Sequence, residues 1–125
     1  KAETDADYDR ALKFCIENLK SIAVCAGTHN EASTLRLVEL MGKTKLPSND
    51  DRIHFAQLLG MSDHLSYNLA ANGYHAAKYV PYGQVHVLIP YLIRRAQENT
   101  AIQGQTSREL WLIAHELRRR SLSPV

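Results

Sequence analysis

Short apolar runs alternate with longer amphipathic stretches along most of this chain. Residues 5–20 carry apolar side chains at helical spacing, with acidic residues in the first turn, and this pattern predicts a helix. Residues 21–27, SIAVCAG, form a continuous apolar run that ends at a glycine, which is typical of a strand buried on both faces of a parallel sheet. Residues 28–43 return to helical spacing, with Thr28 or Asn30 as the candidate N-cap.

The same alternation continues to the end of the chain. It predicts strands at 52–60 and 74–80, and helices at 61–73, from about Gln84, and at 106–120. Pro90 lies about two turns into the helix that begins near Gln84, so it marks either a later helix start or a kink. Strands that alternate with helices of this length indicate βα units around a parallel sheet, and hence an α/β fold.

The number of strands limits what this fold can be. Three predicted strands are too few for a closed βα barrel, which needs eight strands in typically about 250 residues. With 125 residues, the chain is long enough for one domain but not for two, so residues 1–125 are interpreted as a single segment. The segment is either a small open three-layer domain or one part of a larger barrel. The first ten residues have no methionine and no apolar signal-peptide core, so we expect the chain to begin inside a longer protein.

Composition excludes several classes of function. Fifteen basic against thirteen acidic residues leave a formal charge of +2, which demands neither a nucleic acid nor an anionic membrane as partner. Cys15 and Cys25 are too few for a disulfide scaffold, and we expect two buried thiols in a reducing compartment. No run of eighteen apolar residues predicts a membrane-spanning helix. The histidines lack the close spacing of metal ligands, so no metal site is predicted.

Polar, charged and aromatic residues that could bind a ligand follow the predicted strands, where α/β folds place their binding sites. The three strands end in GTHN, LLGMSD and YVPYG, and the next helix carries YLIRRAQEN. Within that helix Tyr91, Arg95 and Glu98 stand at i, i+4 and i+7, with Arg94 beside them. By themselves Arg94 and Glu98 would most often be a solvated ion pair, and the tyrosines would be core or rim aromatics. Two arginines can also bind one carboxylate together, because the planar guanidinium group matches a carboxylate with two parallel hydrogen bonds.

Taken together, these motifs carry a family resemblance. THN after a buried strand, QLLGM after the next, YVPYG after the third and YLIRRAQEN on the following helix resemble the C-terminal part of the flavin-dependent proline dehydrogenases, from about residue 7 to residue 120. The resemblance implies the C-terminal portion of a distorted (βα)8 barrel, namely its last three strands and closing helices. It also implies flavin adenine dinucleotide (FAD) as cofactor and the oxidation of L-proline to pyrroline-5-carboxylate.

The resemblance also implies roles for individual residues in binding the substrate. Arg94 and Arg95 would hold the substrate carboxylate, while Tyr79, Tyr91 and Leu58 would pack around the pyrrolidine ring. The phenol of Tyr79 would favour proline over 4-hydroxyproline, because relatives that use hydroxyproline carry a smaller residue there.

Further residues are implied on the cofactor side. Thr28 and His29 match flavin contacts of the family, with Asn30 beside them, and Glu98 would orient the arginine pair. No residue of this chain is expected to act as a catalytic nucleophile, because the flavin carries out the redox chemistry.

The family's earlier barrel strands have no counterpart here, so a missing N-terminal barrel segment or a second chain is an expected partner. Membrane quinone is the electron acceptor that the resemblance implies. The corresponding location is the bacterial cytoplasm at the inner membrane face, or the mitochondrial inner membrane. The alternative is a non-catalytic α/β interaction domain, or a fragment, that has kept the barrel's shape.

Overall fold

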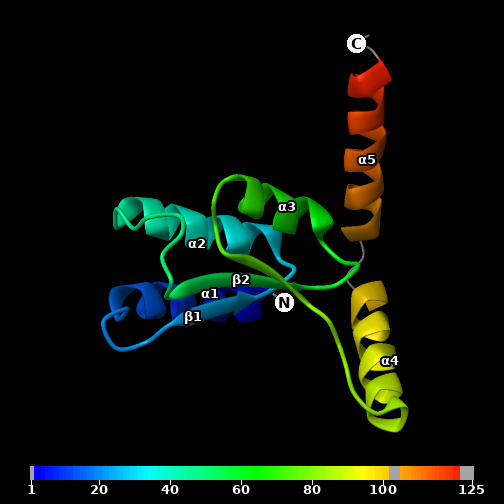
Figure 1. Ribbon diagram of the computed structural model, residues 1–125, viewed down its shortest axis with the longest axis horizontal. Coiled ribbons are helices and arrows are strands. Elements are labelled where there is room, and N and C mark those ends of the chain that lie inside the picture. The colour runs from blue at the N-terminus through cyan, green and yellow to red at the C-terminus, as the bar shows by residue number, and fades with distance from the viewer. Residues whose placement is uncertain (1, 102–104, 122–125) are drawn as a thin grey trace. The chain divides into compact units, whose positions relative to one another are not determined.

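The computed structural model describes residues 2–101 and 105–121, without the side chains of residues 98–109 (Figure 1). The chain divides after Val80 into two compact units, and each is described by itself. The first unit is an α/β structure in which helices and strands alternate, as the sequence predicts. Its elements are α1 (Ala2–Glu17), β1 (Val24–Gly27), α2 (Glu31–Lys43), β2 (Ile53–Leu58), α3 (Asp63–Ala71) and β3 (Ala76–Tyr79).

The strands form a three-stranded parallel sheet in the order β1-β2-β3. Each connection from one strand to the next runs through one helix, as parallel pairing requires. Local sequence signals fix the helix limits. Asn30 is the N-cap of α2, with its side-chain oxygen accepting from the backbone N–H groups of Ala32 (3.0 Å) and Ser33 (3.5 Å). Gly73, with φ +79°, follows Asn72, the C-cap of α3.

A single apolar core fills the space between one face of the sheet and the helices of this unit. In β1 and β2, alternate residues, among them Val24, Ile53 and Phe55, point into this core and are at most 5% exposed, whereas Ala76 of β3 is partly buried against it. The helices contribute Leu12, Ile16, Leu37, Leu40, Met41 and Leu69, and Leu19, just beyond α1, also belongs to the core. We call this side the covered face.

The other side of the sheet is the open face, and it corrects two expectations from the sequence. It is formed by the intervening strand residues, which are exposed or only partly buried: Cys25, Gly27, His54, Ala56, Leu58, Ala77 and Tyr79. The run SIAVCAG is therefore not buried on both faces, and Cys25 is exposed rather than buried, while Cys15 is half-buried. Every residue in that run is small or apolar, so its hydropathy pattern does not distinguish the buried positions from the exposed ones.

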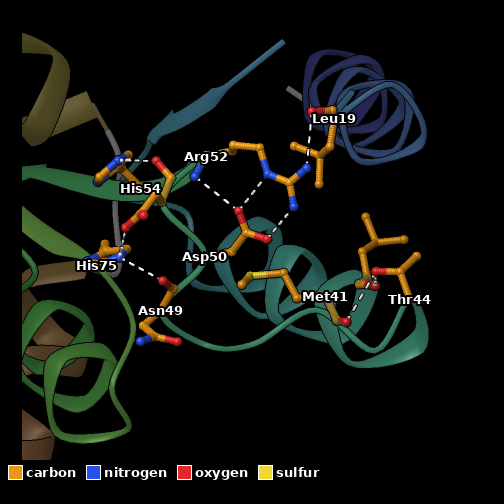
Figure 2. A network of polar contacts seen from close by, with 10 residues as sticks. Leu19, Met41, Thr44, Asn49, Asp50, Arg52, His54 and His75 are labelled. Atoms are coloured by element: carbon orange, nitrogen blue, oxygen red, sulfur yellow. Dashed lines mark hydrogen bonds and ion pairs between the residues drawn. The ribbon is translucent and has the colours of Figure 1, made fainter. Parts of the chain in front are cut away.

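The amino ends of the strands are tied to α1 by a charged contact (Figure 2). Asp50 is 7% exposed, and its carboxylate accepts from the backbone N–H (3.0 Å), Nε (2.8 Å) and Nη2 (2.5 Å) of Arg52. Nη1 of Arg52 donates to the carbonyl of Leu19, just beyond α1, at 3.4 Å. These hydrogen bonds lower the pKa of Asp50 to about 2.

A pair of histidines lies beside this contact. The rings of His54 and His75 have centroids 5.1 Å apart and are tilted by 31°, and His75 Nε2 contacts the backbone carbonyl of Asn49 at 3.0 Å (Figure 2). Within the described residues no group of three or more histidine, cysteine or acidic side chains could hold a metal ion.

The second unit contains two helices, α4 (Val85–Ala101) and α5 (Gln105–Ser121). The predicted start of the first helix near Gln84 is confirmed, since the Gln84 carbonyl accepts from Val87 N (3.0 Å) and Leu88 N (2.9 Å). The helix continues through Pro90, so the later start is wrong. No helix in the described part of the chain is long and apolar enough to cross a membrane.

The Asp50–Arg52 contact predicts a specific dependence of stability on pH. Because the pKa of Asp50 is lower in the folded state than its usual 3.8, the ionised carboxylate stabilises the fold above about pH 4, and this contribution is lost as the pH falls towards 2. The melting temperature of Asp50→Asn should therefore lie below that of the wild type at pH 6, and the difference should shrink at pH 2–3. Asp51→Asn is the matched control, because the Asp51 side chain is 99% exposed. Equal shifts for both variants at pH 6 would contradict the prediction.

Candidate functional site

The carboxyl ends of the three strands lie at one edge of the sheet, because the strands are parallel. The segment after β1 holds Thr28, His29 and Asn30, the segment after β2 runs from Leu59 to Ser62, and β3 ends at Tyr79. The structure thus brings the residues predicted after the first two strands to the same edge as Tyr79.

Strand register places small residues side by side on the open face near this edge. Gly27 pairs with Ala56, and Ala56 pairs with Ala77, so one row across all three strands carries no side chain larger than a methyl group. A Cβ added at Gly27 would meet no atom within 4 Å. The row is therefore a flat surface on which a planar group can lie close to the backbone.

Larger side chains follow in the next row towards the carboxyl edge. Leu58 and Tyr79 are register partners and project from the same face of adjacent strands. Leu58 is partly buried and Tyr79 is 54% exposed. The two residues that were predicted to contact a substrate ring are thus neighbours in space, with an apolar and an aromatic surface.

The Thr28–Asn30 segment is held by its own hydrogen bonds. Thr28 Oγ1 accepts from the backbone N–H of Asn30 at 3.0 Å. His29 is half-buried, and its Nδ1 lies 2.9 Å from Ser62 Oγ, in the segment after β2. The side-chain oxygen of Asn30 caps α2, so a cofactor contact from this side chain would use the amide nitrogen.

Two polar residues on the covered face join the strand ends, and the sequence analysis missed both. Gln57, 2% exposed, donates from Nε2 to the Thr28 carbonyl at 3.3 Å and accepts at Oε1 from Ser66 Oγ at 2.8 Å. Its register partner Lys78 donates to the Met61 carbonyl at 2.6 Å. The available signal was a polar residue at an inward position of an otherwise apolar strand, in HFAQLL and in AAKYV.

The predicted substrate arginines lie on α4, in the second unit. Arg95 is half-buried, and its guanidinium carbon lies 5.4 Å from the centroid of the Tyr91 ring, within the range of a cation–π interaction. Arg94 is exposed, one position before it. The Glu98 side chain lies outside the described residues, so its expected contact with the arginine pair stays a prediction.

Each unit supplies a different kind of chemistry. The sheet edge offers a flat surface, an apolar and aromatic pair and a segment rich in hydrogen-bonding groups. The helix offers two cations, whose planar forks match a carboxylate. By itself, the sheet edge favours contact with a flat, largely apolar group. By itself, the arginine pair favours binding of a carboxylate.

Comparison with known proteins identifies relatives along most of the chain. The family model described as proline dehydrogenase matches residues 1–108. Proline dehydrogenase 1, mitochondrial, from Bos taurus is 43% identical over 123 residues, which is 94% of this chain and 20% of the relative. The Homo sapiens protein of the same name is 42% identical over 120 residues, with the same coverage. Hydroxyproline dehydrogenase from Bos taurus is 38% identical over 123 residues, covering 95% of this chain and 26% of the relative.

A solved structure agrees with these matches. The crystal structure of proline utilization A (PutA) from Bdellovibrio bacteriovorus, inactivated by N-propargylglycine, superimposes with a TM-score of 0.73 at 30% identity, covering 82% of this chain and 10% of that one. The chain spans about a fifth of the length of its mitochondrial relatives. The match over residues 1–108 and the relatives' identity along almost the whole chain show that this chain belongs to the proline dehydrogenase family.

Proposed function

We propose that this chain is the C-terminal portion of a flavin-dependent proline dehydrogenase barrel, active when the rest of the barrel is present. The reaction is the oxidation of L-proline to pyrroline-5-carboxylate, in which the ring C–N bond becomes a double bond and the substrate gives up a hydride and a proton. The observation that carries the proposal is the pairing of Leu58 with Tyr79 at the carboxyl edge of a parallel sheet, in a chain of this family.

The shape of the sheet supports the barrel. β1 and β3 are its edge strands, and its open face carries small and apolar groups next to an exposed Tyr79. In a closed barrel such edges pair with further strands, and such a face turns inward. We therefore propose that a segment N-terminal to this one, or a second chain, supplies the remaining strands.

The residues present fit a flavin. The row Gly27, Ala56 and Ala77 leaves space for a flat ring system, and the adjoining Thr28–His29 segment supplies hydrogen-bonding groups at a helix N-terminus, where cofactor phosphates bind favourably. Thr28, His29 and Asn30 would hold FAD from this side. FAD, when bound, would accept the hydride, and the protein residues would position the substrate and exclude water.

The substrate would be held by two kinds of contact. Arg94 and Arg95 would bind the carboxylate of L-proline, and Glu98 would orient them. The contact of Arg95 with the Tyr91 ring would restrict the orientation of one of the two guanidinium groups. Leu58, Tyr79 and Tyr91 would pack against the apolar part of the pyrrolidine ring. Such positioning would lower the activation barrier of hydride transfer, because this step requires the reacting atoms to be about 3 to 3.5 Å apart.

The electron acceptor and location extend this proposal. The relatives from Bos taurus, Homo sapiens and Drosophila melanogaster are named as mitochondrial. We propose membrane quinone as the acceptor, with the enzyme at the mitochondrial inner membrane or, in a bacterium, in the cytoplasm at the inner membrane face. Yellow colour and flavin absorbance of the purified assembly separate the enzyme from a non-catalytic interaction domain.

The open sheet predicts that this segment does not stand alone. The unpaired edges of β1 and β3 should associate with other strands, because edge strands of a largely apolar sheet are templates for pairing. Expressed by itself, residues 1–125 should form higher-order species in light scattering, and adding the remaining barrel strands should restore one defined species. A monodisperse monomer of the isolated segment would contradict this expectation.

The arginine pair predicts a loss of catalytic efficiency on conservative substitution. In the assembled enzyme, Arg94→Lys or Arg95→Lys keeps the charge but removes the bidentate fork, so kcat/KM for proline should fall about 30-fold, or about 2 kcal/mol. Arg36→Lys is the matched control, because Arg36 lies on α2 and pairs with Glu39 at 2.7 Å. A change smaller than about threefold at Arg94 and Arg95 would refute their role in substrate binding.

Tyr79 predicts the choice between proline and 4-hydroxyproline. An added ring hydroxyl would collide with the phenol or be buried without a partner, at a cost of roughly 1 to 3 kcal/mol, so proline should be preferred. Tyr79→Ser should narrow this preference by opening space and supplying a polar partner, with flavin content unchanged. Steady-state kinetics with both substrates measure the effect.

The same change at Tyr82, which is 97% exposed, is the control and should leave the preference unaltered. A wild type that already prefers hydroxyproline, or loss of flavin from Tyr79→Ser, would show that Tyr79 does not lie at the ring.

A further inference from the structure

The Gln57 side chain is a buried amide whose two polar ends are both engaged. It lies on the covered face of β2, two positions after the fully buried Phe55, and it is 2% exposed. Nε2 donates to the carbonyl of Thr28 at 3.3 Å, and Oε1 accepts from Ser66 Oγ at 2.8 Å. An aliphatic side chain of similar size would fill the same volume without the cost of burying an amide, so packing alone does not explain this residue.

The two partners of Gln57 belong to segments far apart in the sequence. Thr28 begins the segment after β1, and Ser66 lies in the first turns of α3. Gln57 therefore links the segment after the first strand to the helix after the second. An amide suits this position because it donates at one end and accepts at the other.

A second contact joins the same two segments. His29 Nδ1 lies 2.9 Å from Ser62 Oγ, and Ser66 Oγ also donates to the Ser62 carbonyl at 3.3 Å. Ser62 has a φ of +51°, a left-handed conformation that is uncommon for serine, and this backbone conformation directs the start of α3. With two links, from Gln57 to Thr28 and from Ser62 to His29, the segment is fixed relative to α3.

We infer that Gln57 is a positioning residue for the cofactor: it holds Thr28 and His29 in place from the covered face, opposite the open face where a flavin would lie. The inference rests on the proposed function, which makes Thr28 and His29 flavin contacts. Gln57 itself lies on the far side of the sheet from that site and acts through the Thr28 carbonyl.

The test compares Gln57→Leu with Ile53→Val in the assembled enzyme. Both changes affect buried residues of β2, but Ile53 lies at the amino end of the strand, away from Thr28. Two quantities are measured: amide hydrogen exchange of residues 28–34 without flavin, and the dissociation constant of FAD for the apoenzyme from flavin fluorescence.

The expected result is a change in Gln57→Leu alone. Exchange of residues 28–34 should become faster, and the dissociation constant of FAD should rise about tenfold, which corresponds to about 1.4 kcal/mol. Ile53→Val should lower the melting temperature but leave both quantities within about twofold of the wild type.

Gln57→Glu provides a second test, based on the protonation of the new carboxyl group, and it remains informative where the leucine variant fails to fold. A neutral carboxyl group can donate to the Thr28 carbonyl while accepting from Ser66, whereas the ionised group can only accept. FAD affinity of this variant should therefore approach that of the wild type at low pH and fall as the pH rises through the range in which buried carboxyl groups ionise. The wild type should show no such fall, and a flat profile for the variant would overturn the inference.

His29→Ala separates failure of the inference from failure of the proposed function. If exchange of residues 28–34 in Gln57→Leu matches Ile53→Val, Gln57 does not position the segment. If His29→Ala weakens FAD binding and Gln57→Leu does not, the positioning role fails while the cofactor assignment stands. If neither variant changes FAD affinity, the cofactor assignment itself is wrong.

Discussion

The two-residue period of three parallel strands is the constraint on which the first unit depends. Because successive side chains point to opposite faces, each strand sends one set of residues into the core between sheet and helices and the other set to the open face. Register then aligns equivalent positions across the sheet, so that Gly27, Ala56 and Ala77 form one row and Leu58 and Tyr79 form the next. The candidate binding surface therefore follows directly from the pairing of the strands.

The covered face changes character along the strands. Near the amino ends it is apolar, with Ile53 and Phe55 fully buried. At the carboxyl ends it carries Gln57 and Lys78, which hydrogen-bond to the segments that follow the strands. The apolar part stabilises the sheet through burial, whereas the polar part fixes loops that could not be held by nondirectional packing. The segments that follow β1 and β2 are therefore held from the covered face of the sheet.

The second unit supplies permanent positive charge, which no strand residue on the open face of the sheet carries. Neither Gln57 nor the Thr28–Asn30 segment presents a permanent positive charge, whereas α4 carries Arg94 and Arg95 on adjacent positions. Helical spacing brings Arg95 over Tyr91, and the ring restricts the orientation of this one guanidinium. The contrast between a half-buried Arg95 and an exposed Arg94 is a difference that adjacency in the sequence does not indicate.

By itself, the sequence determined the order of elements, the parallel sheet and the family, because periodicity and motif order are local properties. It left Thr28 and Asn30 as alternative N-caps of α2, and the structure decided for Asn30. The tertiary structure decided which face of each strand is buried, and so corrected the prediction for Cys25. It also showed that Gln57 joins Thr28 to Ser66. These last features depend on register and on contacts between residues distant along the chain, and hydropathy cannot encode them where every residue in a strand is small or apolar.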